Sequence, residues 1–164
     1  MGPCADLCKR RLTRCRSSGL GLATVRELVK EGAYVAILDR SLPPSDVDHV
    51  RFFETDITET EQVENAVEKT VAWAKQTGAA LGGVINCAGV GVAAKILDSQ
   101  NQPHSLELWN FTISVNLTGT FNLTRFVLKH LVEVHPEDPD DEERGVVIMV
   151  SSAAAVSLLS IQLL

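Results

Sequence analysis

Aromatic residues and positive charges are both scarce in this chain of 164 residues. Only 5% of the residues are aromatic, and Tyr34 is the one tyrosine. The net charge is −6 at pH 7, which argues against a nucleic-acid-binding protein, because such proteins gain affinity by neutralising phosphates. The longest apolar stretch near the end of the chain, residues 153–164, is too short to span a bilayer. We therefore expect no nucleic-acid partner and no membrane span.

Cysteine is also too sparse for a disulfide scaffold. Cys4, Cys8 and Cys15 lie in a basic N-terminal stretch, and Cys87 lies in an apolar run. No histidines stand near the first three at the spacing of a zinc site, so we expect no bound metal. The basic stretch is compatible with an organelle transit segment, but it lacks the apolar core of a secretory signal.

Strand and helix patterns alternate along the chain after residue 17. Because 45% of the residues are hydrophobic, the chain can bury the core of one domain. The alternation is typical of an α/β protein whose parallel sheet is covered on both faces. We expect strands at residues 33–38, 51–55, 83–87 and 145–151, and helices that begin near Leu20 and span 60–77 and 106–134, the last capped by Ser105.

The order of glycines, helix, strand and acid at the start of this pattern is that of a dinucleotide site. Gly19, Leu20 and Gly21 open the first helix, where backbone N–H groups and the helix dipole favour a pyrophosphate. Asp39 closes the next strand, eighteen residues after Gly21. A carboxylate near this spacing binds the ribose hydroxyls and repels a 2′-phosphate, so the pattern favours NAD over NADP. The alternative is a flexible turn followed by an ordinary capping acid.

Three further strand ends carry residues suited to a ligand. The Asp56 side chain could accept a hydrogen bond from an adenine amino group, with the Ile57 backbone against the ring, although a helix-capping acid explains Asp56 equally well. Ligands bind at the carboxyl ends of parallel strands, so the other two ends are candidates as well. These are the small residues Asn86, Cys87, Ala88 and Gly89, and the hydroxyls of Ser151 and Ser152.

These motifs, in this order and spacing, resemble the short-chain dehydrogenase/reductase superfamily from Ser18 to about Ala155. Residues 85–128, including the polar insertion 100–104, are most similar to mitochondrial type 2 3-hydroxyacyl-CoA dehydrogenases. The resemblance implies a Rossmann-like, doubly wound parallel sheet. It also implies reversible, NAD-linked oxidation of a secondary alcohol such as a 3-hydroxyacyl-CoA thioester, with steroids as substrates of some members.

The resemblance also implies roles for two residues and a setting for the protein. Ser152 matches the serine that hydrogen-bonds the reacting oxygen. Asn116 matches the helix asparagine that holds a water of the proton relay; the alternative is an ordinary polar position on a long helix. Members of the family commonly form homo-oligomers. A mitochondrial location follows from the family, with the cytoplasm as the alternative.

Two departures from the family pattern stand out. The family uses a tyrosine followed four residues later by a lysine, but Leu38 follows Tyr34 at that spacing and the last lysine is Lys129. At the other end, Arg14 and its neighbours replace an apolar strand and the first glycine of the motif. We therefore expect an incomplete sheet that lacks its first strand and its C-terminal part. The expected division is a basic arm (1–17), a partial dehydrogenase domain (18–155) and an apolar tail (156–164).

Three interpretations follow from these observations. The chain represents a dehydrogenase whose functional form is longer; or it is a catalytically dead module for nucleotide binding or oligomerisation, pairing through the helix at 106–134; or it is a fragment that does not fold alone. Without the tyrosine, the rate should fall by about a hundredfold to ten-thousandfold or more.

Overall fold

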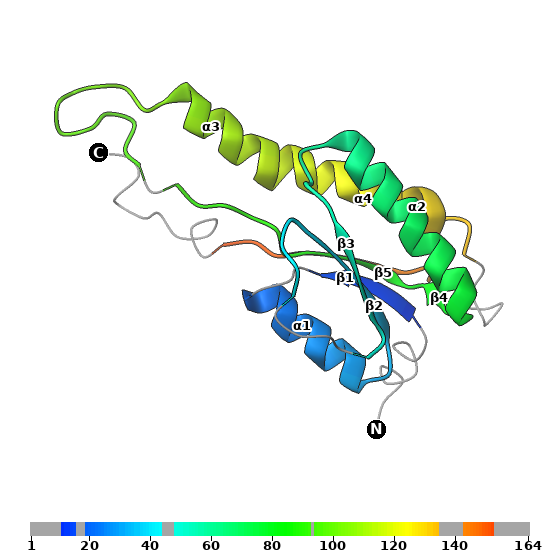
Figure 1. Ribbon diagram of the computed structural model, residues 1–164. Helices are drawn as coiled ribbons and strands as arrows, with labels where there is room; N and C mark the ends of the chain where they lie inside the picture. Colours follow the sequence, from blue (N-terminus) through cyan, green and yellow to red (C-terminus); the bar gives the residue numbers. More distant parts are fainter. Residues whose placement is uncertain (1–10, 16–18, 44–47, 93, 135–142, 153–164) are drawn as a thin grey trace.

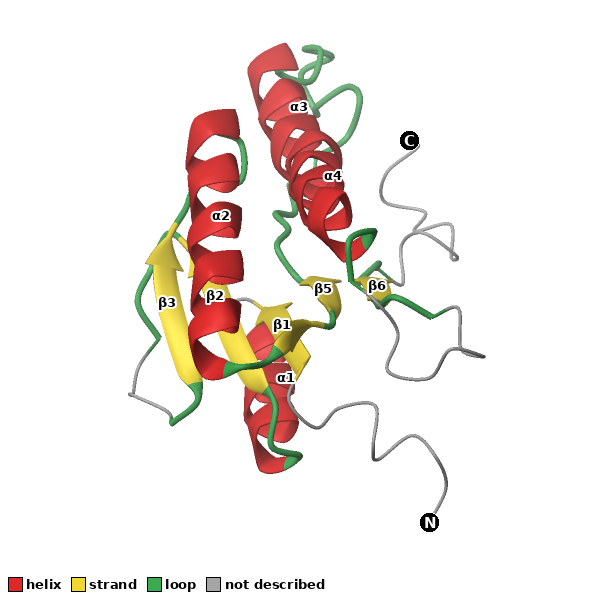
Figure 2. Cartoon of the chain, turned by 90° about the vertical axis from the view of Figure 1, so that its right-hand side faces the viewer, coloured by secondary structure: helices red, strands yellow, loops and turns green. Residues whose placement is uncertain are grey.

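Parallel strands form the central layer of the molecule (Figure 1). The computed structural model describes residues 11–15, 19–43, 48–92, 94–134 and 143–152. One sheet has the order β3-β2-β1-β4, and β5 pairs with β6 beside it. Figure 2 shows β5 and β6 continuing the layer beyond β1. The strands are β1 (Arg11–Cys15), β2 (Tyr34–Asp39), β3 (Val50–Glu54), β4 (Ala80–Leu81), β5 (Gly83–Asn86) and β6 (Val146–Met149).

The order of the strands creates a switch point in the middle of this layer. From β1 the chain proceeds outward through β2 to β3, and it then returns to β4 and β5 on the other side of β1 before reaching β6. All described strand pairs are parallel. In such sheets, ligands bind at the carboxyl ends of the strands where the direction of winding reverses.

Helices cover both faces of the layer. Helix α1 (Gly19–Lys30) lies on one face, and α2 (Thr60–Thr77) and α4 (Thr120–Leu131) lie on the other (Figure 2). Side chains of a strand alternate between faces, and β2 shows this clearly. Val35 and Ile37 pack in a cluster with Val25 of α1, whereas Ala36 and Leu38 join the cluster formed with α2 and α4. The expected α/β class with a doubly wound parallel sheet is confirmed.

The expectation that the first strand is absent is wrong. Residues Arg11–Cys15 form β1, which pairs with β2 from Leu12 opposite Tyr34 to Cys15 opposite Ile37, and with β4 on its other edge. The prediction was based on the polar residues in this segment, because a central parallel strand is usually almost entirely apolar. A β-ladder, however, is made by backbone N–H and C=O groups, which every residue of this segment carries. Proposed boundaries of the domain, at residues 17 and 155, stay predictions, and residues 153–164 lie outside the described part.

The predicted helix at 106–134 is present but not uniform. It consists of α3 (Leu106–Ile113), a π-helical segment η2 (Ser114–Gly119) and α4. Ser105 caps α3 as expected, since its Oγ accepts a hydrogen bond from the Leu108 N–H at 3.3 Å. Segments of π-helix occur often at functional sites, and η2 contains Asn116. Among the described helices, none has the length and apolar character needed to cross a membrane.

A cluster of charges braces α2 against α4. The Glu68 carboxylate lies 3.2 Å from Lys129 Nζ and 3.1 Å from His130 Nε2. The hydrogen bond from Lys129 lowers the pKa of Glu68 most; burial opposes it, and the charges of His130 and Lys129 lower the pKa further, so the pKa lies below its usual value. The brace therefore stabilises the fold when Glu68 is ionised.

Replacing Glu68 with Gln should lower the free energy of unfolding by a few tenths to about 1 kcal/mol at pH 7, the range of exposed ion pairs. Because the pKa of Glu68 is lowered in the folded state, the contribution is present above the pKa of the unfolded chain. It is lost as the pH falls through the folded-state pKa. Urea denaturation at several pH values measures this. Glu64→Gln, one turn earlier on α2, is the matched control; an equal effect of both variants at pH 7 would contradict the brace.

Candidate functional site

Two pockets lie at the carboxyl edge of the sheet, and they share the segment that follows β5. The first, the Asp56 pocket, has a volume of about 210 Å³. The second, the Ser152 pocket, has a volume of about 660 Å³. Residues Ala88, Gly89 and Val90 line both. The Asp56 pocket also includes Asp39, Arg40, Asp56, Ile57, Phe111 and Ser114, and the Ser152 pocket includes Asn86, Cys87, Asn116, Thr124, Ser151 and Ser152.

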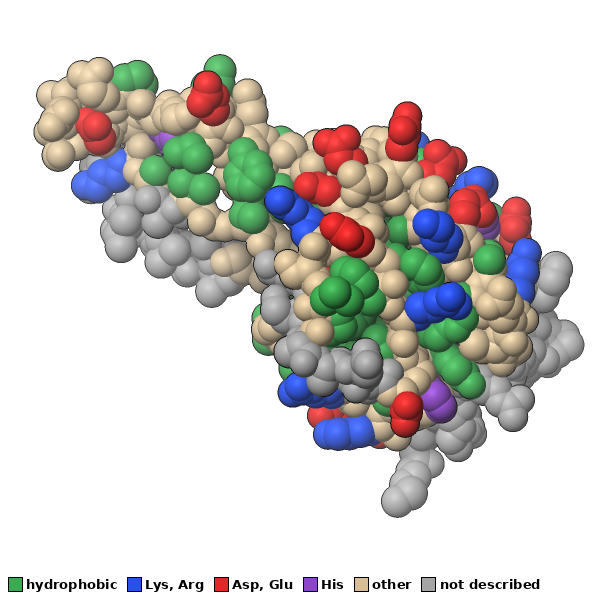
Figure 3. Space-filling model, viewed as in Figure 1, with side chains coloured by type: hydrophobic (Ala, Val, Ile, Leu, Met, Phe, Trp, Pro, Cys, Tyr) green, Lys and Arg blue, Asp and Glu red, His purple; other side chains and the backbone are tan. Residues whose placement is uncertain are grey.

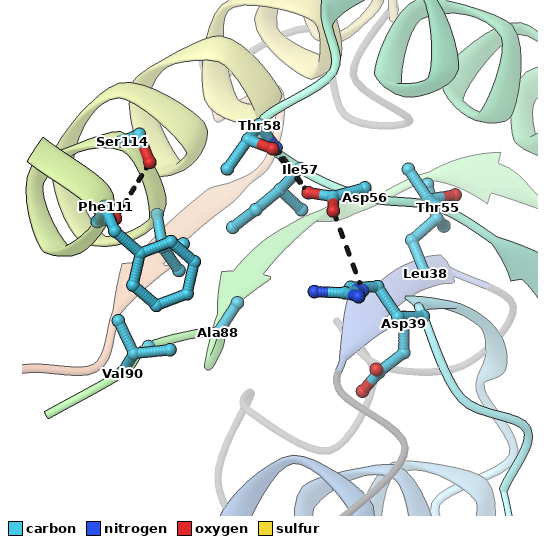
Figure 4. A pocket seen from close by; sticks show the side chains of 13 residues that line it. Leu38, Asp39, Thr55, Asp56, Ile57, Thr58, Ala88, Val90, Phe111 and Ser114 are labelled. Atoms are coloured by element: carbon cyan, nitrogen blue, oxygen red, sulfur yellow. Dashed lines mark hydrogen bonds and ion pairs between the residues drawn. The ribbon is translucent and has the colours of Figure 1, made fainter. Parts of the chain in front are cut away.

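Asp56 is held in one orientation by its neighbours (Figure 4). Its Oδ1 accepts hydrogen bonds from the N–H and the hydroxyl of Thr58, at 2.9 and 2.7 Å. Its Oδ2 lies 3.6 Å from Nε of Arg40. Partial burial raises the pKa of Asp56, but the Thr58 hydrogen bonds and the Arg40 charge outweigh it, so the pKa lies below its usual value. Asp56 is therefore an ionised, preoriented acceptor at neutral pH.

Asp39 lies at the end of β2, next to the end of β3. Its carbonyl accepts a hydrogen bond from the Thr55 N–H at 2.9 Å, which joins the two strand ends. Its Oδ1 accepts a hydrogen bond from the Ser41 N–H at 3.2 Å. Figure 4 shows the other wall of the pocket, where the Phe111 ring lies beside Ala88 and Val90. The pocket thus has carboxylates on one side and an apolar wall on the other.

The Asn116 side chain fixes the segment that separates the two pockets. Its Oδ1 accepts a hydrogen bond from the Val90 N–H, and its Nδ2 donates one to the Val90 carbonyl, both at 2.8 Å. A Cβ on Gly89 would approach Asn116 Oδ1 to 3.4 Å, so a small residue suits this position. An amide can donate and accept further bonds, so the predicted water-holding role stays open and stays a prediction.

Parallel pairing of β5 with β6 brings the ends of these strands to one place. The Val150 N–H donates to the Asn86 carbonyl at 3.0 Å, and the exposed Ser151 and Ser152 follow directly. Both serines line the Ser152 pocket together with Cys87, as the sequence predicted for a shared edge. The catalytic role expected for Ser152 stays a prediction.

The sequence did not reveal the polar contact beneath this pocket. Asn86 is 5% exposed, and its Nδ2 donates to Thr124 Oγ1 at 3.1 Å. The Thr124 hydroxyl in turn donates to the Thr120 carbonyl at 2.8 Å. Asn86 Oδ1 is buried without a hydrogen-bond partner in the described structure. A buried acceptor left unpaired is costly, so this oxygen is suited to receive a donor from a bound molecule or water.

The Cys87 thiol is the one ionisable side chain among the described residues that line the Ser152 pocket. These residues include no carboxylate, imidazole, phenol or amine. Tyr34 begins β2, at the opposite end of the strand from Asp39, and its ring stacks on His49 with a centroid distance of 4.6 Å. It is therefore remote from the site. The described residues also contain no group of three or more potential metal ligands.

The glycines expected to bind pyrophosphate open α1, as predicted. Gly19 has a φ of 55°, a conformation that favours glycine, and Leu20 is 71% exposed, whereas Gly21 is buried. None of the three lines the Asp56 or the Ser152 pocket. The preceding residues 16–18 lie outside the described part, so the pyrophosphate site stays a prediction.

Comparisons with known proteins agree with this architecture. The sequence profile described as short chain dehydrogenase matches residues 15–161. Bovine 3-hydroxyacyl-CoA dehydrogenase type-2 is 35% identical over an alignment of 148 residues, and the match covers 85% of this chain and 54% of the relative. Ipsdienol dehydrogenase of Ips pini is 32% identical, over 87% of this chain and 56% of the relative. The chain thus spans about half the length of the curated relatives it matches.

Solved structures show the same fold. A short-chain dehydrogenase from Leptospira borgpetersenii, solved with bound NAD+, matches 96% of this chain and 57% of its own, with a TM-score of 0.75 and 22% identity. Ligand-free aldohexose dehydrogenase of Thermoplasma acidophilum matches 90% of this chain and 51% of its own, with a TM-score of 0.71 and 21% identity. The sheet and the edge site define an α/β protein of the Rossmann type. By its sequence, the chain belongs to the short-chain dehydrogenase family.

Gly119 couples η2 to the Asp56 pocket through a close contact that the sequence did not reveal. A Cβ at Gly119 would lie 2.8 Å from Ile57 Cγ1 and 3.2 Å from the Ile57 carbonyl oxygen. Ile57 is itself 8% exposed and lines the pocket. Only glycine therefore allows this approach.

Replacing Gly119 with Ala should lower the free energy of unfolding by about 1 to 3 kcal/mol, the usual cost of overpacking. It should also weaken the binding of any ligand in the Asp56 pocket, because Ile57, which lines this pocket, must move. Thermal denaturation measures the first effect. Gly91→Ala is the control, since no atom lies within 4 Å of a Cβ there. Wild-type stability in Gly119→Ala would contradict the close contact.

Proposed function

We propose that this chain binds NAD and contributes the nucleotide-binding part of a dehydrogenase that oxidises a secondary alcohol. The observation that carries the proposal is the meeting of Asp39 and Asp56 in one pocket with the segment that follows β5. Carboxylates at the ends of adjacent parallel strands are suited to bind the hydroxyls and amino group of an adenosine. Membership of the short-chain dehydrogenase family supports the reaction type.

The residues fit the two halves of such a cofactor. Asp39 would accept hydrogen bonds from the ribose hydroxyls, and Asp56, fixed by Thr58, would accept one from the adenine amino group. Gly19 and Gly21 would place the N-terminus of α1 against the pyrophosphate. The nicotinamide half would enter the Ser152 pocket, where the unpaired Asn86 Oδ1 offers an acceptor.

The chain's own groups supply orientation and a hydrogen bond to the reacting oxygen. NAD, when bound, takes up the hydride of the alcohol carbon. The Ser152 hydroxyl would hydrogen-bond the alcohol oxygen, and Asn116 would keep the Val90 segment in place between the two pockets. Removal of the hydroxyl proton needs a base, and the described lining of the Ser152 pocket offers no carboxylate, imidazole, phenol or amine for this step. We therefore expect the chain to bind NAD but to oxidise the alcohol slowly.

The second candidate is a nucleotide-binding module that does not catalyse. The specific observation in its favour is that the same described lining has no carboxylate, imidazole, phenol or amine, since Tyr34 is the only tyrosine in the chain and lies elsewhere. A 3-hydroxyacyl-CoA thioester is the substrate we propose, on the strength of the relatives' names. A steroid-like alcohol, a homo-oligomer and a mitochondrial rather than cytoplasmic location stay predictions.

Two measurements on the purified chain separate these functions. NADH fluorescence should rise on binding, and a chain that leaves it unchanged would contradict the proposal. Oxidation of 3-hydroxybutyryl-CoA with NAD+ should be at least about a hundredfold slower than for the bovine relative, because the described lining of the Ser152 pocket has no carboxylate, imidazole, phenol or amine to act as the general base. A rate equal to that of the relative would contradict the inference that turnover is impaired.

Replacing Asp39 with Ala should weaken NADH binding by roughly tenfold to a hundredfold, the value of hydrogen bonds to a charged group. NADPH binding should weaken less or improve, because the repulsion of its 2′-phosphate disappears. Fluorescence titration with both nucleotides measures the ratio of the two dissociation constants. Asp48→Ala, which lies before β3 at the opposite end of the sheet, is the control. An unchanged ratio in Asp39→Ala would exclude Asp39 from the ribose site.

A further inference from the structure

A third pocket lies along the same helical rod as the Ser152 pocket, toward its N-terminal end. This Trp109 pocket has a volume of about 550 Å³. Its apolar lining comes from α3 and from the extended segment that follows Val90. Figure 3 shows apolar side chains gathered at the α3 end of the molecule. The lining residues used below are Val92, Ala94, Ile96, Leu106, Trp109 and Thr112.

The Trp109 and Ser152 pockets share both of their walls. On the helix, Trp109 and Thr112 line the first pocket and Asn116 and Thr120 line the second. These residues recur every three or four positions, so they lie on one side of the rod. The opposite wall is continuous too, since residues 86–90 line the Ser152 pocket and Val92 begins the lining of the Trp109 pocket. The clamp between Asn116 and Val90 holds the two walls together between the pockets.

The chemistry of the Trp109 pocket selects an apolar, uncharged occupant. Its described lining contains no lysine, arginine or carboxylate, and His104 is the one side chain there that is able to carry a charge. The Ser105 hydroxyl already accepts a hydrogen bond from the Leu108 N–H, and the Thr112 hydroxyl donates to the Leu108 carbonyl at 2.8 Å. Trp109 is 56% exposed and Leu106 is 70% exposed, so their apolar surface is available. A phosphate-bearing group would meet only the single imidazole of His104 in this lining, whereas a hydrocarbon chain would cover the apolar side chains.

We propose that the Trp109 pocket receives the hydrocarbon end of an elongated alcohol or ketone whose oxygen lies at Ser152. The inference rests on the proposed function and goes beyond it by fixing the orientation of the substrate. Thr120 lies eleven positions after Trp109, which corresponds to about 16 Å along the helix at about 1.5 Å per residue. A long acyl chain spans this distance and a short one does not. For a CoA thioester, the coenzyme end would therefore point away from α3.

The test is a titration of the NADH-saturated chain with 2-butanone, 2-heptanone and 2-undecanone, followed by calorimetry. Each methylene that enters the pocket should tighten binding about fourfold, from ~0.8 kcal/mol per buried methylene. In a Trp73→Phe background, Trp109 is the only tryptophan, and its emission should shift to the blue with the long ketones alone. Dissociation constants independent of chain length would overturn the proposal.

Ala94→Phe should fill the pocket without touching the cofactor site. We expect this variant to bind 2-undecanone no better than 2-butanone, while its affinity for NADH is that of the wild type. Ala72→Phe adds the same volume on the exposed side of α2 and should leave the chain-length dependence intact. Persistence of that dependence in Ala94→Phe would overturn the proposal.

Different results of these titrations would refute the proposed function and the inference about the Trp109 pocket. NADH binding with no ketone binding would refute the Trp109 pocket and leave the cofactor site in place. Ketone binding that strengthens with chain length, in the absence of NADH binding, would support the pocket and refute the cofactor site. Circular dichroism checks that each variant is folded. If Ala94→Phe does not fold, Ala94→Leu takes its place, and this smaller substitution should shorten the longest ketone that the pocket accepts.

Discussion

The paired hydrogen bonds between the Asn116 side chain and the Val90 backbone are the contact on which the candidate site depends. They join the helical rod of α3, η2 and α4 to the segment that leaves β5. The three pockets are arranged around this contact: the Asp56 and Ser152 pockets share Val90, and the Trp109 pocket begins at Val92. Without this contact, the Val90 segment, which lines both the Asp56 and the Ser152 pocket, would lose its two hydrogen bonds to the helix.

The sheet beneath this contact is held by two separate apolar clusters. Val25 of α1 packs against Val35 and Ile37, and residues of α2 and α4 pack against Ala36 and Leu38 on the other face. Because both clusters depend on β2, Asp39 at its end has a fixed position. β3 is aligned with β2 residue by residue, with Asp39 opposite Glu54, so Asp56 follows two residues later at the same edge. The two carboxylates thus meet through strand register.

The site has groups that can bind a nucleotide, but few that can transfer a proton. Asp56 is ionised and preoriented, and Asn86 offers a buried acceptor. The described lining of the Ser152 pocket nevertheless holds no carboxylate, imidazole, phenol or amine. Family membership supports the proposed reaction type, but this reaction also needs a proton acceptor at the alcohol oxygen. Nucleotide affinity and catalytic rate are therefore separate properties of this chain and are to be measured separately.

The sequence by itself determined the α/β class, the bounds of α2, the Ser105 cap and the strand-end residues, because each follows from local periodicity or from a short motif. It did not reveal β1 or β4. A polar segment pairs through its backbone, and a two-residue strand has no pattern. Only the tertiary structure decided that η2 is π-helical, that Asn86 meets Thr124 thirty-eight residues away, and that Gly119 lies against Ile57. These contacts join distant segments, and close packing rather than local preference determines which residues meet there.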